Sequence, residues 1–280
     1  MSRPRTSHYK IVISGHIVEA MQYAKAVGYS LESSKKQAPY RKRRALAEQE
    51  ITASSLSRTK NRLIRLVNAN CFMWTDIDGQ IIKPQFLTYT IHENIKTVEQ
   101  ANPLFTNYIK RLNYHTYGTK ASVIKYVVVP EFQKRGAVHY HAVFFNLPMI
   151  NSRREYKTGE FAKVWEHGYI KKRNISKVPN VGLYMTKYMT KDAMDRRLVG
   201  RKKYFSSRGL LKPEVITYEH LAGDMMDYLS ELKPMHAYIT SPNDERPFVE
   251  NPTFCATYNL STEQLHDLRN FYTLDSANLR

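Results

Sequence analysis

The most informative part of the sequence is VIKYVVVPEFQKRGAVHYHAVFF, residues 123–145. It opens with an apolar, β-branched run from Val123 to Val129, which predicts a strand that ends at Pro130. Residues 134–136 (Lys-Arg-Gly) predict a turn, and a second strand is expected from Ala137 to Phe145. Two strands joined by so short a connection are expected to form an antiparallel hairpin.

The second of these strands contains two histidines, His139 and His141, on either side of Tyr140. Side chains alternate along a strand, so both imidazoles are expected on one face and Tyr140 on the other. Two neighbouring imidazoles suit a divalent metal ion, and Glu131 on the partner strand offers a carboxylate as third ligand. This ligand set favours Mg²⁺ or Mn²⁺ over a closed structural zinc site. Two polar residues on a solvated sheet face are the alternative interpretation.

A tandem repeat, YMTKYMTK, occupies residues 184–191. On a helix, Tyr184 and Tyr188 share one face, and so do Lys187 and Lys191. A tyrosine can act as a covalent nucleophile if a positive environment or a general base compensates for its pKa near 10. The lysines would lower that pKa or stabilise charge on a phosphate. The alternative interpretation is a half-buried aromatic stripe with lysines beside it.

Hydrophobic periodicity predicts the other elements. Their order (strand, helix, strand, strand, helix, strand, helix) indicates an α+β fold in which an antiparallel sheet has helices on one face. Residues 1–50 show no clean strand pattern and are expected to be helical or irregular. The predicted elements outside the hairpin are a basic amphipathic helix at 54–70, a strand at 86–91, a helix at 97–117, a helix at 153–166, a short strand at 168–172 and a helix at 180–192.

The chain of 280 residues carries a net charge of +18 that is unevenly distributed. Residues 1–75 hold 14 basic and 4 acidic side chains, whereas residues 214–280 hold 4 basic and 11 acidic ones. The distribution predicts a basic, mainly helical N-terminal extension (1–75), a central domain (76–213) and an acidic C-terminal extension (214–280). Clustered cations neutralise phosphates, so nucleic acid is the expected partner.

Other classes of protein are disfavoured by the composition. No apolar run reaches the length of a membrane span, and the N-terminus lacks the apolar stretch of a signal peptide. Cys71 and Cys255 do not have a metal-binding spacing, which argues against a disulfide scaffold or a cysteine-based zinc site. An intracellular, soluble, basic protein is expected.

Three motifs, taken in order, resemble those of the HUH endonucleases, specifically the rolling-circle replication initiators (Rep proteins) of plasmids and single-stranded-DNA phages. The first is the strand Phe86–Thr90, the second is His139–His141, and the third is Tyr184–Lys191. The resemblance extends from about Arg58 to Pro213. Two wider runs also resemble bacterial and phage members: PEFQKRGAVHYH (130–141) and YFSSRGL (204–210).

This resemblance implies a central antiparallel sheet of the RRM/ferredoxin-like type and a metal-dependent endonuclease and strand transferase that acts on single-stranded DNA. His139, His141 and Glu131 would hold Mg²⁺ or Mn²⁺, which would polarise the scissile phosphate. A motif tyrosine would attack in line and leave a 5′-phosphotyrosine link and a free 3′-OH primer. A later attack would close the displaced circle. If only one tyrosine acts, Tyr184 is expected, because single-tyrosine members place a lysine three residues after the nucleophile.

The expected partners follow from the same resemblance. The sequence lacks the G-x-x-x-x-G-K-[ST] loop of a helicase domain, so a host helicase or supercoiling must unwind the origin, and a host DNA polymerase extends the primer in the bacterial cytoplasm. The oligomeric state stays open. Contacts to single-stranded or supercoiled origin DNA are expected from nine basic residues: Arg58, Arg62, Arg65, Lys171, Lys172, Arg173, Arg201, Lys202 and Lys203.

Two alternatives remain at this point. A relaxase or transposase would use the same HUH chemistry, although relaxases place the tyrosine before the histidine motif and here it follows. A non-catalytic module that binds single-stranded nucleic acid would use surface aromatics of the sheet for base stacking. In that case His139 and His141 would be dispensable.

Overall fold

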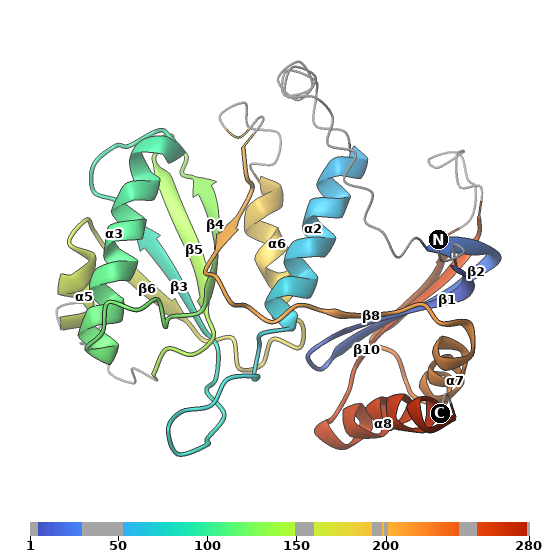
Figure 1. Cartoon of the computed structure of the whole chain (residues 1–280). Coiled ribbons are helices and arrows are strands. Elements are labelled where there is room, and N and C mark those ends of the chain that lie inside the picture. The colour runs from blue at the N-terminus through green and yellow to red at the C-terminus, as the bar shows by residue number, and fades with distance from the viewer. Residues whose placement is uncertain are drawn as a thin grey trace. The chain divides into compact units, whose positions relative to one another are not determined.

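The structure of the chain is a computed structural model. The structure describes residues 5–29, 53–148, 160–191, 198, 201–240 and 251–278. The chain divides into two compact units, one made of residues 1–37 and 212–280 and the other of residues 38–211 (Figure 1). This division differs from the expected parts at 1–75, 76–213 and 214–280, because strands from both ends of the chain belong to one sheet.

The unit of residues 38–211 is built on a five-stranded antiparallel sheet with the order β6-β3-β5-β4-β7. The predicted hairpin is confirmed as β4 and β5, and the α+β class is confirmed as well. The strands are β3 (Gln85–Thr90), β4 (Tyr126–Phe132), β5 (Val138–Phe144), β6 (Ile170–Arg173) and β7 (Phe205–Ser206).

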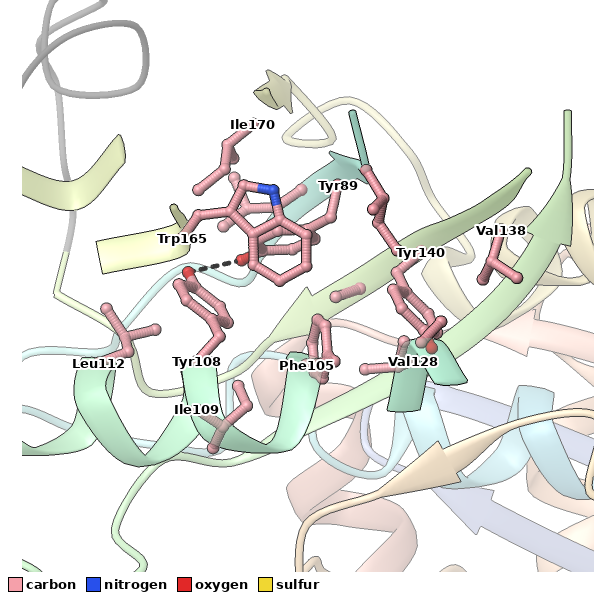
Figure 2. Close-up of a cluster of buried hydrophobic side chains, with 14 of the residues drawn as sticks. Tyr89, Phe105, Tyr108, Ile109, Leu112, Val128, Val138, Tyr140, Trp165 and Ile170 are labelled. Atoms are coloured by element: carbon pink, nitrogen blue, oxygen red, sulfur yellow. Dashed lines mark hydrogen bonds between the residues drawn. The ribbon is translucent and has the colours of Figure 1, made fainter. Parts of the chain in front are cut away.

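One face of this sheet packs on α3 (Val98–Tyr117) and α5 (Glu160–Trp165) around a cluster of aromatic side chains (Figure 2). Trp165 is fully buried, and its ring centroid lies 5.2 Å from that of Tyr89 and 5.3 Å from that of Tyr108. The two tyrosine hydroxyls hydrogen-bond at 2.9 Å, and Trp165 Nε1 donates to the carbonyl oxygen of Thr90 at 3.0 Å. The polar atoms of this core are therefore paired, as buried tyrosine and tryptophan require.

The opposite face is also covered, by α6 (Val181–Lys191) with α2 (Ala53–Asn68) packed on it (Figure 1). The prediction that helices cover only one face is therefore wrong. The physical reason is that this face also carries apolar side chains, such as Phe86 and Val129, and Met185 and Met189 of α6 bury them. Of the helix predicted at 153–166, residues 153–159 lie outside the described residues.

The first strand of the hairpin does not end at Pro130, as predicted, but continues to Phe132. Proline lacks the N–H that a strand with neighbours on both sides needs for its hydrogen bonds. On the β7 side, however, the residues of β4 that pair with β7 are Val127 and Val128. Pro130 lies beyond that pairing, where its missing donor breaks no bond to β7. The extension is what brings Glu131 into register with β5.

The second unit is an antiparallel sheet with the order β8-β1-β2-β10-β9, whose inward side chains pack on α7 (Glu219–Ser230) and α8 (Thr262–Asn278). The prediction of helical or irregular structure near the N-terminus is wrong for residues 5–29, which form two strands, whereas α2 confirms the basic helix. The strands are β1 (Arg5–Ser14), β2 (Ile17–Tyr29), β8 (Glu214–Ile216), β9 (His236–Thr240) and β10 (Thr253–Asn259).

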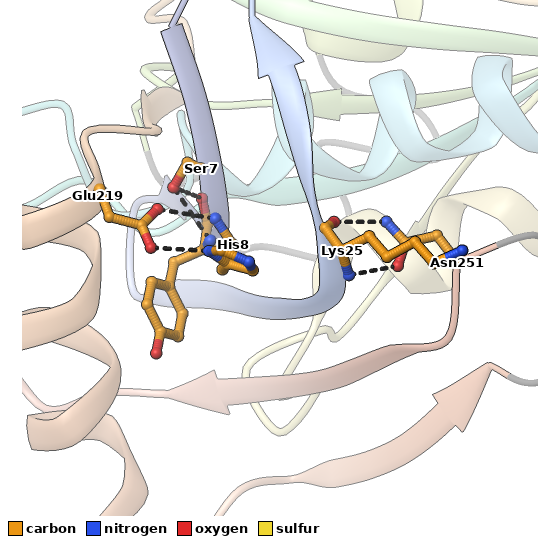
Figure 3. Close-up of polar contacts among 6 residues, drawn as sticks. Ser7, His8, Lys25, Glu219 and Asn251 are labelled. Carbon is orange, nitrogen blue, oxygen red and sulfur yellow. Dashed lines mark hydrogen bonds and ion pairs between the residues drawn. The ribbon is translucent and has the colours of Figure 1, made fainter.

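Polar contacts join the two ends of the chain within this unit (Figure 3). The backbone N–H of His8 donates to Glu219 Oε2 at 2.8 Å, and His8 Nδ1 lies 3.0 Å from Glu219 Oε1. Asn251 Oδ1 accepts from the N–H of Lys25 at 2.8 Å, and its Nδ2 donates to the carbonyl of Lys25 at 2.7 Å. The acidic C-terminal region is thus an integral part of a sheet with the N-terminal strands.

None of the described helices has both the length and the apolar character needed to cross a membrane.

Candidate metal centre and tyrosine pair

The β4–β5 hairpin brings the three predicted ligands together. Register pairs Glu131 with His139, and His141 lies two residues further along β5 on the same face. One ligand atom from each residue lies within 4.8 Å of the others, and His141 Nε2 is 2.5 Å from Glu131 Oε2. Glu131 and His141 are buried, whereas His139 is half-buried. Two imidazoles and a carboxylate that converge in this way can hold a divalent cation.

Two threonines of β3 contact the imidazoles from the next strand. Thr88 is in register with His141, and its Oγ1 lies 3.2 Å from His141 Nδ1. Thr90 is in register with His139, and its Oγ1 lies 2.7 Å from His139 Nε2. A hydroxyl on the ring nitrogen that faces away from the other ligands orients an imidazole, and Thr88 has this position at His141, whose Nε2 faces Glu131. The sequence interpretation missed this role, although the alternation in Phe86–Thr90 puts both threonines on one face.

The third motif lies on α6, over the face that carries these ligands. The ring of Tyr188 stacks on that of His141, with centroids 3.8 Å apart and planes inclined by 23°. The hydroxyls of Tyr184 and Tyr188 hydrogen-bond at 2.7 Å, so both tyrosines point the same way as predicted. Phe86 lies beneath the pair, with its ring centroid 5.3 Å from that of Tyr184 and 5.4 Å from that of Tyr188. The tyrosine pair and the three candidate ligands therefore form one site.

The electrostatics of Tyr184 differ from the prediction. Burial raises its pKa to about 12, and the hydrogen bond and charge interaction with Tyr188 act in the same direction. Arg173 is the cation that lowers this pKa, and its guanidinium carbon lies 5.4 Å from the Tyr184 ring centroid. Lys187 Nζ lies 5.3 Å from the same centroid, on an exposed side chain. The side chain of Lys191 lies outside the described residues.

A close approach between α2 and α6 fixes the position of the tyrosine helix. A Cβ atom at Gly182 would lie 2.3 Å from the carbonyl oxygen of Ile64, so only glycine fits at this crossing. Asn68 Oδ1 accepts from the N–H of Gly182 at 2.8 Å, and its Nδ2 donates to Asn180 Oδ1 at 3.0 Å. Asn180 Oδ1 also accepts from the N–H of Leu183 at 2.8 Å, which caps the start of α6.

The basic run 171–173 is divided between the two faces of the sheet. Lys171 is in register with Thr88 and therefore lies on the face of the candidate site, as does Arg173. Lys172 is in register with Leu87, which belongs to the α3 core, and burial lowers the pKa of its ammonium. The structure thus brings two of these three predicted DNA contacts to the site and places the third on the opposite face.

The other predicted DNA contacts are dispersed. Arg201 pairs with Glu99 of α3, on the side of the sheet away from the candidate ligands. Lys202 is exposed, and Lys203 Nζ donates to the carbonyl of Leu198 at 3.0 Å. The remaining three are exposed or half-exposed on α2: Arg58, Arg62 and Arg65.

Comparison with known proteins gives one family. A family model whose description begins "Replication-associated protein ORF2" matches residues 84–193. No curated protein and no solved structure matches the chain. The matched span runs from the start of β3 to just past α6, so it contains the three candidate ligands and both tyrosines. This part of the chain is therefore similar to a family of replication-associated proteins.

Proposed function

We propose that the protein is a rolling-circle replication initiator of the HUH type, which nicks and rejoins single-stranded DNA at an origin. The observation that carries the proposal is the 3.8 Å stacking of Tyr188 on His141, which sets a pair of hydrogen-bonded tyrosines against the candidate metal ligands. A binding module has no need of that juxtaposition. The similarity of residues 84–193 to replication-associated proteins supports the initiator over a relaxase or transposase with the same chemistry.

The arrangement of the sheet supports the HUH assignment. The matched part of the chain has the order strand, helix, strand, strand, helix, strand, followed by α6, and the four strands lie in the order β6-β3-β5-β4. We assign this to the RRM/ferredoxin-like arrangement that the motifs imply. It puts the first-motif strand, β3, next to β5, so the threonines and the histidines meet on the same face.

The proposed reaction is an exchange of phosphodiester bonds. The tyrosine hydroxyl oxygen attacks phosphorus in line, the bond from phosphorus to the 3′ oxygen breaks, and that oxygen leaves with the electron pair. The tyrosine proton is lost to solvent and the leaving oxygen gains one, so a 5′-phosphotyrosine and a free 3′-OH result. A divalent ion, Mg²⁺ or Mn²⁺, held by Glu131, His139 and His141 would polarise the scissile phosphate as a Lewis acid.

We assign the first cut to Tyr188. The sequence argument for Tyr184 rests on a lysine three residues later, but Lys191 follows Tyr188 at the same distance, so this spacing does not separate the two. Tyr188 contacts His141 directly, whereas Tyr184 is only 9% exposed and has a raised pKa. Tyr184 is then available for the later joining step.

The proposed partners are single-stranded or supercoiled origin DNA, a host helicase and a host DNA polymerase. The substrate is tested with labelled single-stranded oligonucleotides that tile the protein's own replicon, incubated with Mg²⁺ or Mn²⁺ and separated on a denaturing gel. We expect a cut and a covalent protein–DNA adduct that disappear with EDTA, with His141→Ala and with Tyr188→Phe.

Tyr114→Phe serves as the matched control, because Tyr114 is an exposed tyrosine on α3, and it should cut like the wild type. Retention of the adduct in Tyr188→Phe and its loss in Tyr184→Phe would reverse the assignment of the two tyrosines. If the wild type binds the oligonucleotides but forms no adduct with either metal, the catalytic proposal is wrong and the binding module replaces it.

A further inference from the structure

The edge of the sheet beside the candidate site carries a row of exposed side chains. β6 is the edge strand, with β3 as its neighbour in the sheet order. Tyr169, just before β6, is 67% exposed, and Lys171 and Arg173 are exposed at the next two positions of the same face. Alternate strand residues are roughly 6.5 Å apart, so the row offers one aromatic ring and two cations at regular spacing.

The position of Tyr169 is fixed by the backbone. The N–H of Thr90 donates to the carbonyl of Tyr169 at 2.8 Å, and the N–H of His92 donates to that of His167 at 2.8 Å. Gly168 between them has φ +150°, and a Cβ there would lie 2.1 Å from the carbonyl oxygen of Thr90. Only glycine permits this approach, which extends the pairing of β3 and β6 and holds Tyr169 at the edge.

His92 supports the ring of Tyr169 from one side. The imidazole of His92, also exposed, packs edge-to-face against this ring with centroids 4.8 Å apart. A neighbour of this kind orients the ring, while the 67% exposure of Tyr169 leaves most of its surface accessible. An exposed aromatic in a fixed orientation is the feature that proteins use to stack an unpaired base.

The row runs parallel to the candidate catalytic residues. Tyr169 lies beside Thr90, which contacts His139; Lys171 is in register with Thr88, which contacts His141. Arg173, at the end of the row, lies over the ring of Tyr184. A strand of DNA that follows the row therefore runs alongside the candidate ligands, with β3 between them, and ends at Arg173 beside Tyr184.

We infer that Tyr169, Lys171 and Arg173 form a track for single-stranded DNA, in which a base stacks on Tyr169 and phosphates contact the two cations. The inference rests on the proposed function and deepens it, because it names the residues that hold the substrate next to the scissile phosphate. Stacking on an aromatic tolerates any base, so the track contributes affinity for single strands and not recognition of the origin sequence.

The test measures binding without cleavage. A fluorescein-labelled oligo-dT strand is titrated with each variant in EDTA, and its anisotropy gives the dissociation constant. We expect Tyr169→Ala to weaken binding roughly tenfold, because the variant loses the stacking of a base on the aromatic ring. Tyr169→Phe keeps the ring and should bind like the wild type, while Tyr169→Leu should behave like the alanine variant.

Two matched controls separate the track from general surface effects. Tyr114 is 60% exposed on α3, on the other side of the sheet, so Tyr114→Ala should leave affinity unchanged. Lys171→Ala should weaken binding and reduce its salt dependence, whereas Lys172→Ala, on the opposite face, should not.

Equal affinity of Tyr169→Ala and wild type would overturn the inference, and so would equal effects of Tyr169→Ala and Tyr114→Ala. The result is independent of nicking. A track confirmed by binding in a protein that forms no adduct would refute the catalytic proposal alone, and an active nickase that is indifferent to Tyr169 would refute the track alone.

Discussion

The crossing of α2 and α6 makes a sharp prediction for Gly182→Ala. Alanine is normally the better helix former, so a substitution in α6 that was judged from propensity alone would be expected to stabilise the protein. The structure predicts the opposite, because the new Cβ would lie 2.3 Å from the carbonyl oxygen of Ile64 and 2.8 Å from its Cα. Carbon and oxygen atoms normally approach each other no closer than about 3.3 Å, so the two helices must move apart by about 1 Å.

The expected change in the free energy of unfolding combines two destabilising contributions and one stabilising contribution. Overpacking costs about 1–3 kcal/mol, weakening of the bond from Gly182 N–H to Asn68 Oδ1 costs about 1 kcal/mol, and helix propensity returns at most about 1 kcal/mol. We expect the free energy of unfolding to fall by about 2 kcal/mol. Because α6 also carries the tyrosines, a displacement of this size should lower the nicking rate by about two orders of magnitude.

The assay is urea denaturation of wild type, Gly182→Ala and Gly223→Ala, followed by nicking of the origin oligonucleotide. Gly223 is the matched control: it lies inside α7, and its Cβ would approach the Tyr9 ring no closer than 3.6 Å, an ordinary contact. Gly223→Ala should therefore gain up to about 1 kcal/mol of stability. If Gly182→Ala is as stable as Gly223→Ala, α2 and α6 do not pack closely at Gly182.

Two further predictions concern the candidate site. The pKa of Tyr184 is raised from 10.0 to about 12 in the folded state, so the fold favours the neutral hydroxyl; the stability that results is complete below pH 10 and is lost as pH rises toward 12. The free energy of unfolding of Tyr184→Phe should therefore fall less than that of wild type when urea denaturation is repeated from pH 10.0 to about 12. The same dependence on pH in both proteins would contradict the raised pKa of Tyr184. Thr88→Val removes the hydroxyl beside His141 and keeps the shape of the side chain. We expect the affinity for Mn²⁺, measured by calorimetry, to fall about tenfold. Thr106→Val, at an exposed position, is the control and should leave this affinity unchanged. Unchanged affinity in Thr88→Val would show that the hydroxyl does not orient the imidazole.

Local patterns were sufficient to predict most of the elements around the site. The strand at 86–91 and the helix at 97–117 appear as β3 and α3 within one residue at each end. The His-x-His pair and Glu131 could be placed together because a short hairpin fixes its own register. The contact between Tyr188 and His141 could not be derived in this way, since it joins elements that no local pattern links.

The second sheet shows the limit of local patterns more clearly. β2 pairs with β1 through a tight turn, but its other neighbour is β10, whose residues 253–259 lie far away in sequence. The alternation in β1 is visible, because Ile11 and Ile13 face the helices, yet Val12 between them is also fully buried. A strand buried on both faces loses the period of two that identifies it. Charge was misleading here as well, because the acidic C-terminal region supplies strands of this sheet rather than a separate extension.

The basic run 171–173 shows why charge alone did not assign function within the site. In the sequence the run is three consecutive cations, and all three were predicted equally as DNA contacts. In the β6 strand, neighbouring side chains alternate between the two faces of the sheet, so two of the cations lie on one face and the third lies on the other. Lys172 lies on the face that packs on α3 and Arg173 lies over Tyr184, so two adjacent residues of the same charge have different surroundings. Assigning a role to a charge in a strand therefore requires the register of that strand. For β6 the register depends on β3, which is also the strand whose threonines contact the candidate ligands.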